Sequence, residues 1–258
     1  MTPAGVGTKV FAALLAALIA IPVIAAVPLA FSEQSFVRLP PQNWSLRWWG
    51  AFFADPSWLS ALLESLEVAT LSCLASVAAG TSAALALPRL GPGMRALANG
   101  LFLGPLVAPV IVLAVGLYAM ARSLGLVGST LGLVLAHTML SLPYVVLNVG
   151  VAVAALDPRL VLAASGLGAG PWRAFRTVTL PSILPGIVGG GVFAFVTSFD
   201  EVVLAVFLAG PSVKTLPVRI WEELRVEYTP IVAVAATIMI ALALLGSAVA
   251  RLATSRAT

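Results

Sequence analysis

The stretch 162-LAASGLGAGPWRAFRTVTLPSILPG-186 separates two long apolar runs and differs from both in composition. It contains Arg173 and Arg176, and glycines and prolines interrupt it repeatedly. The stretch is too polar to lie in hydrocarbon and too apolar to be a free linker. We expect its apolar side chains to contact another protein, because an exposed apolar surface of this kind marks an interaction site. These side chains are Ala163, Ala164, Leu167, Trp172 and Phe175.

The composition of the whole chain is that of an integral membrane protein. Of the 258 residues, 60% are hydrophobic and only 9% are charged. A soluble domain carries about 25% charged residues, because its surface faces water. The net charge of +4 is dispersed over short loops, so we expect no nucleic acid to bind. The single cysteine, Cys73, and the single histidine, His137, exclude an intramolecular disulfide and argue against any metal site.

Apolar segments long enough to cross a bilayer recur along the chain, since a crossing takes about 20 helical residues. Six such segments lie at about 10–31, 62–87, 97–121, 130–155, 183–209 and 230–250. Long apolar runs joined by short loops predict α-helices, because the strands of a membrane barrel are about 10 residues long with a period of two. We expect an all-α membrane protein in which residues 1–258 form a single transmembrane domain. The first segment is expected to be an anchor and not a cleaved signal.

The placement of lysine and arginine predicts the orientation of these spans. With the N-terminus inside, eight of the 14 Lys and Arg residues fall on the inner side and six on the outer side. This excess favours a cytoplasmic location for both termini, because basic loops are retained inside. The quoted stretch is then cytoplasmic as well.

Local signals predict two short helices around the quoted stretch. Asp157 followed by Pro158 begins the first, because the carboxylate caps free N–H groups and proline fits the first helical position. Gly168 and Gly170 end it, since glycine adopts the left-handed conformation without steric cost. Pro171 begins the second helix, and Pro181 is expected to stop it.

In this arrangement the residues resemble the EAA loop of ABC-importer permeases. The family pattern is EAA, a few residues, a glycine, then a spaced phenylalanine and a Leu-Pro pair. The matching positions are Ala163, Ala164, Leu167, Gly168, Ala169, Trp172, Phe175, Leu180 and Pro181. Leu162 stands where the motif has its glutamate. The segment 194-AFVTSFDEVVLAVFLAG-210 is similar to the span that follows this loop in spermidine/putrescine-type permeases.

The resemblance implies a type I ABC-importer permease fold with six transmembrane helices and a cytoplasmic coupling-helix loop at 157–182. It implies that the matching loop residues contact an ATPase. The implied assembly contains a second homologous permease subunit, two ATP-binding subunits and a periplasmic or extracellular solute-binding protein in a bacterial inner membrane. The implied cargo is a polyamine such as spermidine or putrescine. Opines, other amino-acid-like solutes, thiamine and ferric ion are the alternatives.

The sequence contains no nucleotide-binding motif of its own. Its only lysines are Lys9 and Lys214, and neither ends a GxxxxGK[ST] loop. We therefore expect that this chain is not an enzyme and binds no cofactor. ATP and Mg are expected at the partner ATPase subunits.

Asp200 and Glu201 are the most costly residues of the predicted spans, since an ionisable group in a membrane helix must face a cavity or a partner. They lie about 15 residues beyond Pro185, or roughly 22 Å of helix, in the outer half of the bilayer. Thr197 lies three residues before Asp200 and four before Glu201, and Ser198 lies three before Glu201, so the polar groups lie on neighbouring faces. This polar patch predicts a passage for a cationic amine. The alternative is that one acid pairs with a neighbouring subunit and shapes a gate.

Other polar and aromatic residues give weaker signals. Glu64 and Glu67 share one face at the mouth of the second span, where they either add negative potential to an entrance or form a solvated helix start. His137 is expected to be a packed, hydrogen-bonded side chain. Glycines 189–191 are expected to permit tight helix packing. The tryptophans predicted to form an interfacial belt are Trp44, Trp48, Trp49 and Trp58.

Two other protein classes are compatible with a helical membrane chain. An intramembrane protease needs a GxSx-type serine facing a histidine, but Ser198 lies in "VTSFD" without that glycine. A secondary transporter is built from inverted repeats, of which the sequence gives no sign, and it leaves the cytoplasmic stretch without a role. The permease interpretation is therefore favoured.

Overall fold

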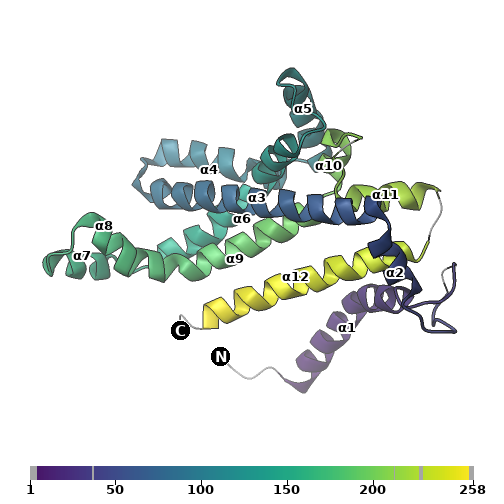
Figure 1. Ribbon diagram of the computed structural model, residues 1–258. Helices are drawn as coiled ribbons and strands as arrows, with labels where there is room; N and C mark the ends of the chain where they lie inside the picture. The colour runs from purple at the N-terminus through teal and green to yellow at the C-terminus, as the bar shows by residue number, and fades with distance from the viewer. Residues whose placement is uncertain (1–4, 37, 212, 227–228, 256–258) are drawn as a thin grey trace. The chain divides into compact units, whose positions relative to one another are not determined.

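The computed structural model describes residues 5–36, 38–211, 213–226 and 229–255, and nearly all of them are helical (Figure 1). An isolated antiparallel bridge joins Ser32 and Trp44. The helices are α1 (Val6–Leu29), α2 (Arg47–Ala54), α3 (Pro56–Ala86), η1 (Leu87–Arg89), α4 (Pro92–Val107), α5 (Val110–Ser123), α6 (Thr130–Ala155), α7 (Pro158–Gly166), α8 (Pro171–Ala174), the π-helical η2 (Phe175–Thr179), α9 (Leu180–Phe199), α10 (Val203–Leu208), α11 (Leu216–Val226) and α12 (Ile231–Ser255). This helical composition of the described residues confirms the predicted all-α class.

The chain divides into two compact units. The first comprises residues 1–59 and 219–242, and the second comprises residues 60–218 and 243–258. The second unit contains every residue predicted to contact an ATPase or to line a passage.

Within the described residues, five helices are long and apolar enough to cross a membrane, or six if the bent pair α4 and α5 counts as one span. The third predicted span, 97–121, corresponds to this pair and is corrected from a straight helix to one bent by 108°. The bend follows from Pro109, which has no N–H to continue the helix and drives Ala108 into an extended conformation with ψ 136°. Pro105 lies inside α4 just before the bend.

The fifth predicted span, 183–209, is also corrected. It is interrupted, because α9 ends at Phe199 and α10 begins only at Val203. Pro181 does not stop a helix as expected: α8, η2 and α9 run on as one helix over Pro171–Phe199. A proline clashes with the carbonyl four residues before it in a regular α-helix. The wider π-helical turn at Phe175–Thr179 ends two residues before Pro181 and changes that spacing.

The second unit is built around a close crossing of α6 and α9. A Cβ atom at Gly190 would lie only 2.9 Å from Cα of Val145, and one at Gly186 only 2.8 Å from the backbone oxygen of Asn148. Hydroxyl groups add bonds between helices, as in Ser141 Oγ donating to the backbone oxygen of Ala194 at 3.2 Å. Small residues that allow such close approach are typical of helix packing in membranes. Glycine at 190 therefore has the predicted packing role.

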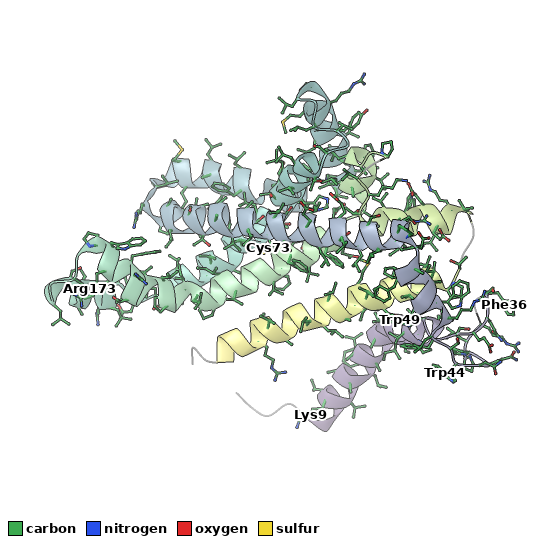
Figure 2. The ribbon with its side chains drawn as sticks, viewed as in Figure 1. Lys9, Phe36, Trp44, Trp49, Cys73 and Arg173 are labelled. Carbon is green, nitrogen blue, oxygen red and sulfur yellow. The ribbon has the colours of Figure 1, made fainter. Side chains whose placement is uncertain are left out.

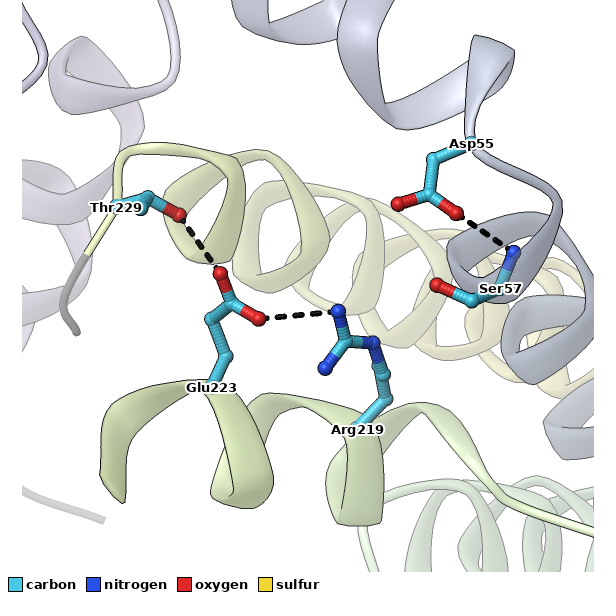
Figure 3. A network of polar contacts seen from close by, with 5 residues as sticks. All are labelled: Asp55, Ser57, Arg219, Glu223 and Thr229. Atoms are coloured by element: carbon cyan, nitrogen blue, oxygen red, sulfur yellow. Dashed lines mark hydrogen bonds and ion pairs between the residues drawn. The ribbon is translucent and has the colours of Figure 1, made fainter. Parts of the chain in front are cut away.

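The first unit contains polar contacts at the start of α3 and, separately, between α11 and Thr229, which lies two residues before α12 (Figure 3). The guanidinium of Arg219 lies 4.7 Å from the ring centre of Trp58 and 3.0 Å from a carboxylate oxygen of Glu223. Thr229 Oγ1 donates to Glu223 at 3.3 Å. Trp58 is only 1% exposed, so it is not a belt residue, whereas Trp44 is 67% exposed.

Asp55 caps the start of α3 in the same unit. Its carboxylate accepts a hydrogen bond from the backbone N–H of Ser57 at 2.8 Å. The hydrogen bond with the Ser57 side chain, then the backbone bond, and the positive charge of Arg219 lower the pKa of Asp55 below its usual value.

Candidate functional site

The α7–α8 elbow adopts the predicted backbone. Asp157 caps α7 by accepting a hydrogen bond from the N–H of Arg159 at 2.9 Å, and Pro158 occupies the first turn. Gly168 has φ +83°, the left-handed conformation that ends the helix. The N–H groups of Gly168 and Ala169 return to the carbonyl oxygens of Ser165 and Ala164, each at 3.0 Å. The elbow is therefore a closed turn held by its own backbone.

The elbow leaves large apolar side chains outside the fold of the second unit. Leu162 is 69% exposed, Leu167 is 90% exposed and Trp172 is 72% exposed. Trp172 stacks on Phe175 with ring centres 5.6 Å apart. Figure 2 shows the side chains that project from α7 and α8, with Arg173 labelled among them.

The predicted docking residues do not all lie at this surface. Ala163, Leu167, Gly168, Trp172 and Pro181 are exposed. The half-buried members of the set are Ala164, Ala169, Phe175 and Leu180. The exposed residues are therefore the ones available to a partner.

A second candidate site lies at the opposite end of α9, where the helix breaks. Asp200 follows the last helical residue and is exposed, and its carboxylate forms no hydrogen bond or ion pair within the described residues. Glu201 behaves differently, because one of its carboxylate oxygens accepts hydrogen bonds from the N–H groups of Val203 at 2.7 Å and Leu204 at 2.9 Å. This oxygen caps α10 by satisfying donors that have no partner within the helix. The two adjacent acids are thus in different environments.

Ser198 is directed into the protein and not towards Asp200's exposed surface. It is 4% exposed, and His137 Nδ1 lies 2.9 Å from its hydroxyl oxygen and 3.1 Å from its backbone oxygen. A carbonyl oxygen only accepts hydrogen bonds, so the second contact requires the proton on Nδ1. His137 itself is fully buried, which confirms the predicted packed, hydrogen-bonded side chain. Thr197 is half-buried.

Glu64 and Glu67 lie within α3 and not at its start, because the helix begins at Pro56. Glu64 is half-buried and accepts a hydrogen bond from Thr130 Oγ1 at 2.7 Å. Glu67 is exposed. Across the described part of the chain, neither residue contacts Asp200 through a hydrogen bond.

Sequence reasoning missed the capping role of Glu201 and the partner of His137. The first had a local signal, since an acid two residues before the start of an apolar helical run is placed to cap it. The second had none, because His137 and Ser198 are 61 residues apart in sequence.

A chain of a bacterial ABC transporter involved in the import of the acidic polysaccharide alginate has the same fold. It superposes with a TM-score of 0.69 at 17% sequence identity, over 94% of this chain and 95% of that chain.

The chain belongs to the family of binding-protein-dependent transport system inner membrane components, which it matches over residues 7–258. The spermidine/putrescine transport system permease protein PotC of Haemophilus influenzae is 31% identical over 224 residues, 87% of each chain. The molybdenum transport system permease protein ModB of Mycobacterium bovis is 36% identical over 193 residues, 69% of this chain and 72% of that one. The chain is therefore a multi-pass inner-membrane permease subunit of an ABC importer, as its loop motif indicated.

Proposed function

We propose that this chain moves a small cationic amine, most plainly a polyamine such as spermidine or putrescine, through an importer driven by ATP. The observation that carries the proposal is the unpaired carboxylate of Asp200 at the end of α9. A helix C-terminus bears partial negative charge, so the carboxylate and the helix end both attract a cation. The 31% identity to a spermidine/putrescine permease over 87% of the chain supports the same substrate class.

The energy enters through the α7–α8 elbow. Leu162, Leu167 and Trp172 are largely exposed and form the surface that docks on a partner ATPase. The partner binds and hydrolyses ATP with Mg, because this chain has no phosphate-binding lysine motif. The continuous helix Pro171–Phe199 then carries motion of the elbow to the break at Asp200.

The complete assembly comprises this chain, a second homologous permease subunit, two ATPase subunits and an extracytoplasmic solute-binding protein. Both termini and the elbow lie in the cytoplasm, in accordance with the excess of basic residues on that side. The break at Asp200 then lies towards the outer surface, where the binding protein delivers its solute.

Transport of radiolabelled spermidine into cells that depend on this importer tests the substrate. Asp200→Asn keeps the size of the side chain and removes its charge. We expect uptake at low substrate concentration to fall about tenfold, the equivalent of about 1.4 kcal/mol for a partly screened charge contact. Unchanged uptake in this variant would remove Asp200 from the passage.

The identity to a molybdenum permease over 69% of the chain makes an oxyanion the second candidate substrate. Uptake of molybdate in the same cells separates the two, because Asp200 repels an anion and Asp200→Asn would then leave its uptake intact or raise it. Molybdate uptake without spermidine uptake would overturn the polyamine assignment and leave the permease assignment in place.

The docking role is tested by deletion of residues 162–170. We expect the ATPase subunits to be absent from a complex purified through this chain, while the second permease subunit remains. Retention of the ATPase subunits would exclude the elbow as their docking surface.

A further inference from the structure

The break between α9 and α10 is capped on both sides by side chains from the second unit. At the end of α9, the carbonyl oxygen of Ser198 is one of the last four carbonyl oxygens of the helix. These four have no N–H group one turn further along the helix to bond with. Its contact within the backbone is with the N–H of Glu201 at a long 3.4 Å, and His137 Nδ1 supplies a shorter contact at 3.1 Å. His137 therefore caps the end of α9 from the neighbouring helix α6.

At the start of α10, Glu201 satisfies the N–H groups of Val203 and Leu204 at 2.7 and 2.9 Å. A six-residue helix makes few internal hydrogen bonds, so its first turn depends strongly on such a cap. Further along, the carbonyl oxygen of Leu208 accepts a hydrogen bond from the N–H of Gly128 at 2.8 Å, which ties the other end of α10 to the turn before α6. The position of α10 is thus fixed at both of its ends.

We infer that Glu201 and His137 are positioning residues: they cap the two helix ends that flank the break and thereby hold the Asp200 carboxylate free at the end of α9. This inference rests on the proposed function, because it takes Asp200 as the residue that contacts the cation. It assigns no cation contact to Glu201. The carboxylate oxygen of Glu201 that makes two short bonds to backbone N–H groups is already committed. Its negative charge also lies at the positive end of α10, which offsets its attraction for a passing cation.

The distinction between a cap and a substrate contact is one of chemistry and can be tested at a single position. A cap needs an oxygen acceptor, which glutamine retains at the same length. A contact with a cation needs the charge, which glutamine lacks. Methionine has similar length and offers neither, so Glu201→Gln and Glu201→Met form a matched pair.

Position 200 can be observed directly because the chain has a single cysteine. Cys73→Ser replaces the thiol, which donates to the backbone oxygen of Gly191 at 3.2 Å, with a hydroxyl that can donate to the same oxygen. In that background, Asp200→Cys places one thiol at the break of the full complex. Its rate of reaction with a membrane-impermeant thiol reagent reports the position and exposure of residue 200, whether or not any amine is transported.

We expect Glu201→Met to change this labelling rate by about threefold or more, the effect of losing a cap, and Glu201→Gln to leave it nearly unchanged. Equal changes in both variants would overturn the inference, because the charge and not the acceptor would then matter. No change in either would overturn it as well, because the cap would not be holding the break. If the methionine variant fails to assemble, Glu201→Ala takes its place in the comparison.

His137 is tested in the same way. The amide nitrogen of asparagine lies near the position of Nδ1, so His137→Asn retains a donor for Ser198, whereas His137→Leu has none. We expect labelling at position 200 to change in the leucine variant and not in the asparagine variant. An unaltered rate in His137→Leu would remove His137 from the assignment.

Uptake measurements in chains that retain Asp200 complete the experiment. Glu201→Gln is expected to transport spermidine with a KM close to that of the parent, while Asp200→Asn raises the KM about tenfold. A rise in KM for Glu201→Gln equal to that for Asp200→Asn would return Glu201 to the substrate contact. If no variant or parent transports spermidine, the proposed substrate fails, but the labelling result still decides the capping role.

Discussion

Replacement of Gly190 by alanine should push apart the two helices at the centre of the second unit. The added Cβ would lie 2.9 Å from Cα of Val145, whereas carbon atoms in contact are about 3.5–4.0 Å apart. The Cα of Val145 is a backbone atom and cannot be moved aside by a change of side-chain rotamer. The helix α9 must therefore move away from α6 by roughly 0.6–1 Å to restore that contact distance. Overpacking of this kind costs about 1–3 kcal/mol. Because this crossing is the main interface of the second unit, we expect the whole unit to lose stability.

The assay is the apparent melting temperature of the purified complex in detergent, followed by intrinsic tryptophan fluorescence. A loss of about 2 kcal/mol corresponds to a fall of roughly 4–8 °C for a chain of this size. Gly189→Ala is the matched control, because its Cβ would meet only Asn148 Oδ1 at 3.6 Å, an ordinary contact. Both variants gain the same helix propensity, about 1 kcal/mol, so that gain cancels in the comparison. Equal melting temperatures for the two variants would refute the packing argument.

Four further predictions concern the elbow and the first unit. Leu167→Glu should abolish co-purification of the ATPase subunits without lowering the melting temperature, since the side chain is 90% exposed; a lower melting temperature would show that Leu167 packs within the fold. Gly168→Ala should weaken the elbow by about 1 kcal/mol. The cost comes from the φ of +83° alone, because nothing lies within 4 Å of the added Cβ. Transport per ATP hydrolysed should therefore fall, and an unchanged ratio of transport to ATP hydrolysis would contradict the prediction. Arg219→Lys should destabilise the complex in thermal unfolding nearly as much as Arg219→Leu, since a lysine does not reproduce the planar contact with Trp58 together with the pair to Glu223. Asp55, whose pKa is lowered on folding, stabilises the protein above its unfolded pKa of about 4, and that contribution is lost as the pH falls through the lower folded value. Asp55→Asn should therefore lower the melting temperature more at about pH 7 than at about pH 3, and an equal effect at both pH values would contradict it.

The sequence alone was sufficient for the features that depend on near neighbours in the chain. Four of the six predicted membrane spans follow from the length of an apolar run, because the bilayer has a fixed thickness; the bend at 97–121 and the break at 183–209 do not. The bounds of α7 follow from Asp157, Pro158 and Gly168, because capping and backbone conformation depend on a few consecutive residues. The motif around this elbow also indicated the family correctly.

Only the tertiary structure decided how the residues near the break divide their roles. From the sequence, Asp200 and Glu201 are equivalent acids in one span, and Ser198 is a third polar group beside them. In the fold, Glu201 caps α10, Ser198 meets His137 on another helix, and Asp200 remains unpaired within the described residues. The reason is physical: the partner of a polar group is set by which backbone donors and distant side chains the packed helices bring within about 3 Å, and spacing along one helix carries no information about that.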